Sequence, residues 1–248
     1  MSWWNDVTSF AATTARLGRG IQARVTRAER QGPKQLLSLF EFEACPYCRK
    51  VREVLTELDL DYRSLPVAQG SPRRSALKRK GGKVQVPFLV DPNTGVQMYE
   101  SADIVAYLER TYGNGVRTPG FIALPGVLDD GLSGLASVWR FGRGSHCRVP
   151  NSRRKLTPLE LFNMEGSPYC RKVREVLSEL DLEHIVRNVP KGSPQREELA
   201  RLGGKVQVPF LLDPNTKIAM YESDEIIAYL DGHYGGRPGR ESHVESNA

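Results

Sequence analysis

The chain has 248 residues, of which 40% are hydrophobic and 26% are charged, a composition typical of a water-soluble globular protein. Its formal charge of +6 favours anionic partners, with nucleic acid, acidic lipid and anionic metabolites all open. Four cysteines are too few for a disulfide-rich secreted scaffold, and no apolar run approaches the ~20 residues of a membrane-spanning helix.

Residues 1–35 are basic and precede the first apolar segment. Their Arg, Thr and Ser content is that of an organelle transit peptide. However, the motif RLGRG at residues 16–20 returns as RFGRG at residues 140–144, where a removable targeting segment has no place. We therefore expect a short basic helix and linker before each of two units. The expected compartment is the cytoplasm, with an organelle stroma or matrix as the alternative for a eukaryotic source.

The chain contains one long segment twice. CPYCRKVREVL at residues 45–55 returns as SPYCRKVREVL at residues 167–177, so that Ser167 stands where the first copy has Cys45. A repeat of this length indicates a duplicated domain, because solenoid repeats are only about 20–50 residues long. We predict globular domains at 36–113 and 158–235, a linker with the second basic helix at 114–157, and a disordered tail at 236–248.

Each unit opens with an apolar strand, expected at residues 36–42 and 159–164. A helix follows, because apolar residues recur with the helical period at Val51, Val54, Leu55 and Leu58. Proline at 46 and 168 suits the first helical turn, where a missing N–H costs nothing. The residue before each proline is therefore the expected N-cap.

The remaining elements of each unit follow from its turn residues. In the first copy, Gly-Ser-Pro at 70–72 opens a second helix and Gly-Gly at 81–82 ends it. Strands at 88–90 and 96–99 flank the turn DPNTG, and a last helix runs from Ser101 to residue 113. This order predicts an α/β fold, with a mixed four-stranded sheet and helices on both of its faces.

Cys45 and Cys48 form a C-x-x-C motif at the start of a helix. The unpaired N–H groups there and the positive end of the helix dipole favour thiolate over thiol. We therefore predict an exposed, attacking thiolate at Cys45 and a resolving thiol at Cys48. The alternative is that both cysteines are merely small buried residues. Burial accounts well for a cysteine at position 48 but poorly for one at the cap position 45. A zinc site is not expected, because His146, Cys147 and Cys170 lack ligand spacing.

Ser167 can form neither a thiolate nor a disulfide, so the second copy has no dithiol chemistry. Its hydroxyl can donate a hydrogen bond to the sulfur of a bound thiol, or can serve only as an N-cap. Cys170 is expected to be a core residue.

Three motifs together resemble the N-terminal, thioredoxin-fold domain of glutathione S-transferases, which is related to glutaredoxin. They are CPYC after a strand, Val86-Pro87 before a strand, and Glu100-Ser101 opening the last helix. The second copy keeps the last two as Val208-Pro209 and Glu222-Ser223. The resemblance implies a glutathione site in each unit. In domains of that family the Val-Pro bond is cis, and the backbone of the valine pairs with the cysteinyl part of glutathione. The Glu-Ser pair holds the γ-glutamyl group, and Tyr47 and Tyr169 either line the site or pack.

The tandem arrangement resembles proteins with two such domains, and four functions follow as expectations. The first is a glutathione-dependent thiol–disulfide oxidoreductase acting on protein disulfides or mixed disulfides, with glutathione binding in the Ser-containing unit. The second is a non-enzymatic module that binds glutathione or protein. Transferase-type conjugation is a weaker alternative, because nothing in these 248 residues matches the family's all-helical second domain. An iron–sulfur carrier is the weakest. The oligomeric state stays open.

A basic run at residues 73–83 is a candidate surface for binding nucleic acid. The second copy has Gln195, Glu197 and Glu198 among the equivalent positions, and no aromatic residues interrupt the first run. We expect a solvated helix face and no nucleic-acid partner.

Overall fold

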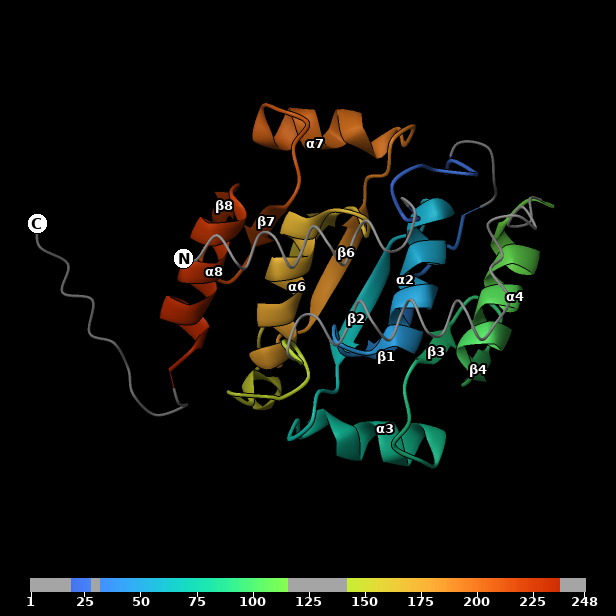
Figure 1. The fold of residues 1–248 in the computed structure, drawn as a ribbon, viewed down its shortest axis with the longest axis horizontal. Coiled ribbons are helices and arrows are strands. Elements are labelled where there is room, and N and C mark those ends of the chain that lie inside the picture. The colour runs from blue at the N-terminus through green and yellow to red at the C-terminus, as the bar shows by residue number, and fades with distance from the viewer. Residues whose placement is uncertain (1–18, 28–31, 116–141, 237–248) are drawn as a thin grey trace, which may run out of the picture.

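The structure, a computed structural model, describes residues 19–27, 32–115 and 142–236 (Figure 1). The expected basic helices and tail lie largely outside these residues. Unit one comprises β1 (Leu37–Glu41), α2 (Pro46–Glu57), β2 (Tyr62–Pro66), α3 (Arg73–Gly81), β3 (Phe88–Asp91), β4 (Val96–Met98) and α4 (Ser101–Tyr112). After a short 3-10 helix (Asn151–Arg153), unit two repeats the order with β5 (Leu159–Asn163), α6 (Pro168–Glu179), β6 (His184–Asn188), α7 (Gln195–Gly203), β7 (Phe210–Asp213), β8 (Ile218–Met220) and α8 (Ser223–Tyr234).

The predicted order of elements is confirmed in both units. Within unit one, β1 and β2 are parallel, while β3 is antiparallel to β1 and β4 to β3, which makes a mixed four-stranded sheet. Unit two has the same pairing. The two sheets are continuous, because β2 pairs with β6 and gives the order β4-β3-β1-β2-β6-β5-β7-β8. The sequence did not predict this junction, which we call the seam.

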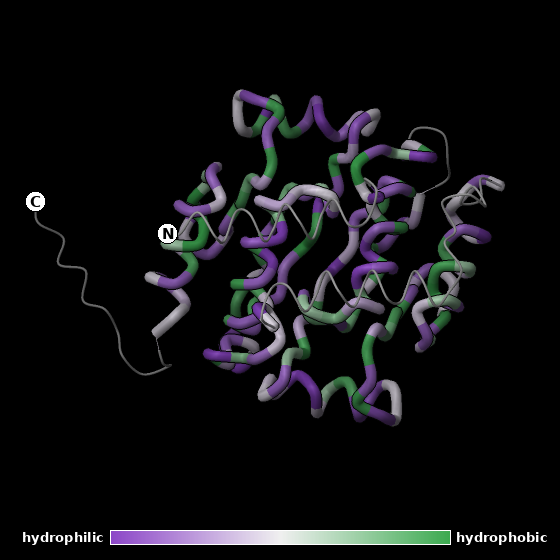
Figure 2. Tube along the Cα trace, in the orientation of Figure 1, coloured by the Kyte–Doolittle hydropathy of each residue, from purple (hydrophilic) through white to green (hydrophobic). Residues whose placement is uncertain are grey.

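Helices cover both faces of the sheet, as predicted. Successive residues of a strand point to opposite faces. Leu39 accordingly packs in a core with α2 and α4, whereas Phe40 packs against Leu77 of α3. Val186 of β6 joins the α2–α4 core, so the corresponding helices α6 and α8 cover the same face. Hydrophobic positions follow the strands, and hydrophilic ones are frequent along α3 and α7 (Figure 2).

The seam has local two-fold symmetry. Its central pair is Arg63 opposite Ile185, which are counterparts in the repeat. Because the pairing is antiparallel, β1 and β5 run in opposite directions. The turns that follow them, which carry Cys45 and Ser167, therefore lie at opposite ends of the sheet, as α3 and α7 do in Figure 1.

Two short segments, arm one (residues 19–25) and arm two (residues 143–149), tie the units together. Gln22 of arm one bridges to Lys191 in unit two, and His146 of arm two bridges to Gln69 in unit one. The Gly20 and Gly144 N–H groups donate to Glu57 and Glu179, counterparts in the repeat, at 3.2 and 2.9 Å. The weak sequence echo around these glycines therefore has a structural counterpart. Among the described residues, no helix combines the length and apolarity needed to cross a lipid bilayer.

Candidate functional site

Cys45 is the N-cap of α2, as predicted, and Pro46 occupies the first helical position. Its extended backbone (φ −73°, ψ 117°) aims the side chain back over the helix end. The sulfur accepts a hydrogen bond from the backbone N–H of Cys48 at 3.3 Å. A sulfur in this position lies where free N–H groups and the helix dipole stabilise negative charge.

The two thiols of the motif have opposite pKa shifts. A hydrogen bond from the Cys48 thiol is the largest cause that lowers the pKa of Cys45, and the Cys48 N–H and the charge of Arg52 act in the same direction against burial. For Cys48, burial comes first and raises the pKa well above its usual range, and the Cys45 charge adds to it. Of the two thiols, Cys45 is therefore the one that loses its proton more readily, and Cys48 the one that retains it.

The sequence predicts a solvent-exposed sulfur at Cys45, and this is wrong. The residue is only 5% exposed. The turn that carries it is buried at the seam: a Cβ on Gly144 of arm two would lie 2.9 Å from the Cβ of Glu43, two residues before Cys45. Residues of unit two and arm two contact Glu43 in this turn, and the local motif gave no sign of these contacts. Cys48 and Cys170 are fully buried.

The Val-Pro motifs lie at the same sheet ends as the caps. The bonds Val86–Pro87 and Val208–Pro209 are both cis. Because β1 and β3 are antiparallel with Phe40 opposite Phe88, Pro87 comes at the end of the sheet where the chain leaves β1 towards Cys45. The equivalent pairing of Phe162 with Phe210 places Pro209 at the Ser167 end.

Glu100 and Ser101 begin α4 at this same end, because Met98 of β4 pairs with Leu89. Glu100, not Ser101, is the N-cap; its φ is +64° and its side chain makes no capping hydrogen bond. Its carboxylate instead accepts from Gln85 Nε2 at 2.7 Å. Left-handed backbone is uncommon outside glycine and often marks functional positions. Glu222 repeats this geometry, with φ +65° and a 2.7 Å bond from Gln207, and Ser223 after it is buried.

Tyr47 and Tyr169 point outwards from the first turns of α2 and α6. Their exposed fractions are 49% and 43%, so neither packs in the core. The Lys50 and Lys172 ammonium groups lie 5.9 and 5.5 Å from the respective ring centroids. Each tyrosine thus presents an aromatic face with a nearby cation beside its cap residue.

Ser167 has the same cap geometry as Cys45. Its Oγ accepts a hydrogen bond from the Cys170 N–H at 3.3 Å, and the residue is 5% exposed. Arm one lies against this turn, since the Gly166 N–H donates to the Gly20 carbonyl at 3.1 Å. A Cβ on Gly166 would come within 2.4 Å of Ile21 Cγ1, so glycine is required by this close approach.

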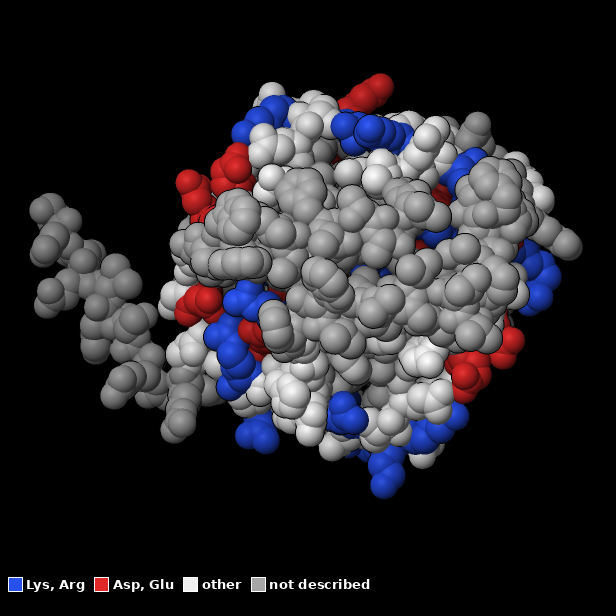
Figure 3. All heavy atoms as spheres, in the orientation of Figure 1, with Lys and Arg blue, Asp and Glu red and all other residues white. Residues whose placement is uncertain are grey.

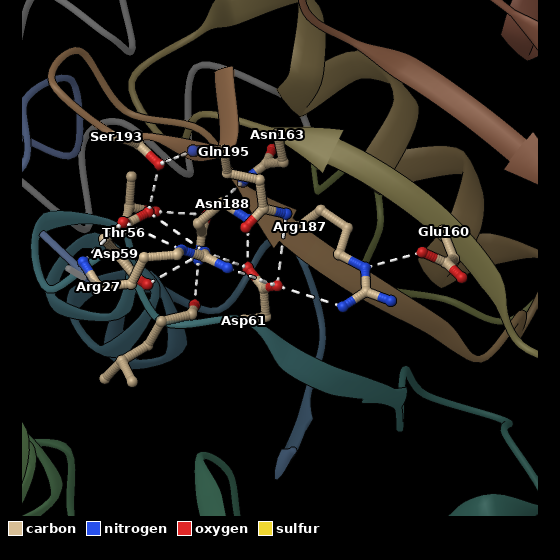
Figure 4. Close-up of polar contacts among 11 residues, drawn as sticks. Arg27, Thr56, Asp59, Asp61, Glu160, Asn163, Arg187, Asn188, Ser193 and Gln195 are labelled. Carbon is tan, nitrogen blue, oxygen red and sulfur yellow. Dashed lines mark hydrogen bonds and ion pairs between the residues drawn. The ribbon is translucent and has the colours of Figure 1, made fainter. Parts of the chain in front are cut away.

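Sequence reasoning missed the polar residues that support the caps. Gln85 and Gln207 carried a usable signal, because KVQVP occurs in both copies. Polar side chains also cross the seam: Ser193 donates to Asp59 at 2.7 Å, and the Asn188 N–H to Asp61 at 3.0 Å. Arg27 binds both aspartates, at 3.1 and 2.9 Å (Figure 4). These partners lie in different units, so no local pattern reveals them.

The basic run forms an exposed face of α3 and the turn after it. The exposed residues are Lys78, Arg79, Lys80 and Lys83, and Figure 3 shows basic side chains along the lower edge where α3 lies. This agrees with the predicted solvated helix face for these four residues, whereas Arg73, at the start of the run, pairs with Asp181 and Glu183 of unit two and its side chain is 12% exposed. Within residues 19–27, 32–115 and 142–236, no group of three or more His, Cys, Asp or Glu side chains is placed to hold a metal ion.

Parts of this chain are similar to known proteins. A family model described as the N-terminal domain of glutathione S-transferase matches residues 39–116 and 161–238, well over half of the chain. The glutathione S-transferase-like protein tpcF of Aspergillus fumigatus is 32% identical over 79 residues, which cover 32% of this chain and 35% of that protein. The match thus spans about a third of that relative's length. The solved structure of Leishmania TDR1, a unique trimeric glutathione transferase, aligns with 82% of this chain and 68% of its own, at 16% identity and a TM-score of 0.30.

Proposed function

Because the chain belongs to the family of glutathione S-transferase N-terminal domains and carries two of them in tandem, we propose that it is a glutathione-dependent thiol–disulfide oxidoreductase of the glutaredoxin type. Membership of this family relates its function to glutathione. The observation that supports the oxidoreductase activity is the difference between the two thiols. Cys45, at the helix N-cap, has a lowered pKa, and Cys48, in the first turn of the helix, has a raised pKa.

The proposed reaction is thiol–disulfide exchange. The Cys45 thiolate attacks the glutathione sulfur of a mixed disulfide, the substrate thiolate leaves and takes a proton, and Cys45 becomes glutathionylated. A second glutathione thiolate then attacks this adduct, which releases oxidised glutathione and restores Cys45. Cys48 can instead attack the adduct and form a Cys45–Cys48 disulfide. Its raised pKa slows that route, because only the thiolate attacks.

Unit two is proposed to bind glutathione without redox turnover. The Ser167 hydroxyl can donate to the sulfur of a bound glutathione, and Val208, Pro209, Glu222 and Ser223 stand where unit one has Val86, Pro87, Glu100 and Ser101. We propose protein disulfides or glutathione mixed disulfides as the substrates of unit one. The proposal requires a compartment with a glutathione pool, and we propose the cytoplasm.

One observation favours a second candidate function. Cys45 is only 5% exposed, so a disulfide can reach its sulfur only after the surrounding chain opens. A tandem module that binds glutathione or protein and performs no exchange needs no such opening. Low exposure therefore supports the non-enzymatic alternative, and the test has to separate binding from turnover.

Reduction of a glutathione mixed disulfide by the full chain, coupled to glutathione reductase, is the test. We expect turnover that falls to background in Cys45→Ser, survives in Cys48→Ser, and is unchanged in the control Cys147→Ser, whose cysteine lies in arm two. Equal activity of wild type and Cys45→Ser would reject the proposal. Glutathione binding without turnover by the intact chain would select the binding module. Conjugation of an electrophile that survives Cys45→Ser and is lost in Ser167→Ala would select transferase-type activity.

A further inference from the structure

The turn before Cys45 is held mainly by unit two. Glu43, two residues before Cys45, is buried. Its carboxylate accepts hydrogen bonds from Nε and Nη2 of Arg174, which lies on α6 of unit two, at 3.0 and 3.1 Å. Its backbone N–H donates to Oγ of Ser178, also on α6, at 3.2 Å. Both the side chain and the backbone of this turn are therefore fixed from across the seam.

Arg52 of α2 links this turn to the same buried cluster. Its Nη2 lies 3.1 Å from the Glu43 carboxylate and donates to the Glu43 carbonyl at 3.3 Å. Nη1 and Nε contact Glu41 and Glu165 at 2.7 and 3.2 Å. Arg174 contacts Glu165 as well, at 3.0 Å, so the two arginines share two glutamates. The side chains of Arg52 and Arg174 are 1% and 3% exposed, so salt and water screen their charges little.

The support differs between the two units. Thr56 is the counterpart of Ser178, and its hydroxyl donates to Asn188 at 2.9 Å rather than receiving the N–H of a cap turn. Asn163 replaces Glu41 and accepts a hydrogen bond from Arg174. The fuller set of ionic and hydrogen-bonding contacts therefore supports the turn that carries a cysteine, and not the one that carries a serine.

We propose that Arg174 of unit two is a positioning residue for Cys45 of unit one. Through Glu43 it fixes the turn that presents the sulfur to the N-terminus of α2, so the unit without a redox thiol sets the reactivity of the unit that has one. The inference rests on the proposed function in one respect, that Cys45 is the reacting thiol.

The direction of the effect follows from the charges. Without Arg174, Glu43 keeps Arg52 as its strong cationic partner, and Arg52 also neutralises Glu41 and Glu165. The negative charge left near Cys45 disfavours its thiolate, and the turn loses its bidentate contact. Both changes make the thiolate less populated at neutral pH.

The test uses the full chain and follows alkylation of Cys45 by iodoacetamide against pH, read from the mass of the peptide that contains it. We expect Arg174→Met to raise the pKa of Cys45, taken from the midpoint of the alkylation rate against pH, by about one unit, which lowers the thiolate fraction at pH 7 by as much as about tenfold. Arg174→Lys, which keeps the charge, should recover most of this loss. In a chain that also carries Glu43→Gln, Arg174→Met should shift the pKa of Cys45 by less than about a third of its shift in the wild-type chain. The reason is that the carboxylate through which Arg174 acts is then absent.

Ser193→Ala is the matched control, because it removes a 2.7 Å hydrogen bond across the same seam without touching the turn before Cys45. Its alkylation profile should equal that of wild type. If Arg174→Met does not fold, as judged by circular dichroism, Ser178→Ala tests the same turn without an unpaired buried charge, and should shift the midpoint of the alkylation profile in the same direction. An unchanged profile in the folded variants, or an equal shift in Ser193→Ala, would overturn the inference. Alkylation needs no turnover, so failure of the proposed function, an alkylated Cys45 with no mixed-disulfide reduction, is a separate result.

Discussion

At the scale of single residues, the difference between the units that matters most for their chemistry is the sulfur of Cys45, which is replaced by the oxygen of Ser167. Cys45 and Ser167 have nearly the same backbone angles and accept the same hydrogen bond, at 3.3 Å, from the N–H three residues on. The Cys48 thiol adds a hydrogen bond that lowers the pKa of Cys45. In unit two, Cys170 is buried and its pKa is raised, and it faces a hydroxyl that does not ionise at neutral pH. One geometry therefore holds an ionisable thiol at one end of the sheet and a hydroxyl that can only form hydrogen bonds at the other.

His184 on β6 makes stability depend on pH. Burial lowers its pKa to about 4. In the unfolded chain a histidine takes up its proton near pH 6.5, so between about pH 6.5 and 4 the unfolded state is protonated while the folded state is not. We expect this residue alone to cost about 2 kcal/mol of unfolding free energy on going from pH 7.5 to pH 5.

His184→Gln should remove that loss, because glutamine can donate to the Leu182 carbonyl, which lies 3.0 Å from the ring, but does not titrate. Urea unfolding of both chains at the two pH values measures the difference. Identical pH dependence in wild type and variant would show that His184 is not the buried titrating group.

The cap residues were predictable from the sequence because their cause is local. Proline at the first helical position and the apolar residues after it fix where α2 and α6 begin. The contacts of the turn before Cys45 were not predictable, because Gly144 and Arg174, which approach Glu43, lie about 100 or more residues away along the chain.

At the scale of elements, each arm makes backbone contacts with both units. Each arm satisfies the C-terminal carbonyls of its own unit's first helix, as when the Arg24 and Arg148 N–H groups donate to the Glu57 and Glu179 carbonyls at 2.6 Å. Each also bridges to the loop after the second strand of the other unit. The arms therefore stabilise the position of one unit against the other.

Gly144 in arm two is expected to be intolerant of any side chain. Its φ is +76°, and a Cβ there would lie 2.9 Å from the Cβ of Glu43 and 3.2 Å from Cα of Glu175. Gly82 is the matched control, because its φ is +80° and nothing lies within 4 Å of its Cβ position. Gly82→Ala should lose about 1 kcal/mol from left-handed backbone alone. Gly144→Ala should lose roughly 1–3 kcal/mol more from the collision. Urea unfolding measures both losses, and equal losses would contradict the close packing of arm two on unit one.

The order of strands and helices followed from sequence patterns alone, since each period and turn signal acts over a few residues. Parts of α2 were misleading in another respect. Arg52 sits between apolar positions and suggests a solvated face, but it is 1% exposed and its guanidinium binds Glu165 of unit two. Charged residues that pair with another unit cannot be told from surface residues by pattern.

At the scale of the whole molecule, the seam resembles the interface of a symmetric dimer. Its central pair would be two identical residues in a true dimer of either unit, but here it is Arg63 opposite Ile185. Like charges directly opposite each other in an antiparallel pair are destabilising, whereas β-branched pairs stabilise. The sequence difference at this position therefore disfavours pairing of unit one with itself, while the ion pair of Arg63 with Glu183 favours pairing of unit one with unit two.

Separate chains of residues 1–115 and 116–248 should show this preference. Ultracentrifugation should find the second chain dimerising at lower concentration than the first, because its central pair is Ile185 with Ile185 rather than Arg63 with Arg63. A mixture should give a 1:1 complex in preference to either dimer. Arg63→Ile in the first chain should raise its self-association. Equal self-association of both chains, with no complex on mixing, would contradict the role assigned to the central pair.

The most direct measurement is the mass of the full Cys48→Ser chain after exposure to oxidised glutathione, followed by identification of the modified peptide. Without Cys48 to resolve it, the adduct should accumulate, and we predict one glutathionyl group per chain, located on Cys45 and removed by reduced glutathione. A chain that stays unmodified at Cys45 while Cys147 reacts would show that the sulfur at the head of α2 does not exchange with glutathione.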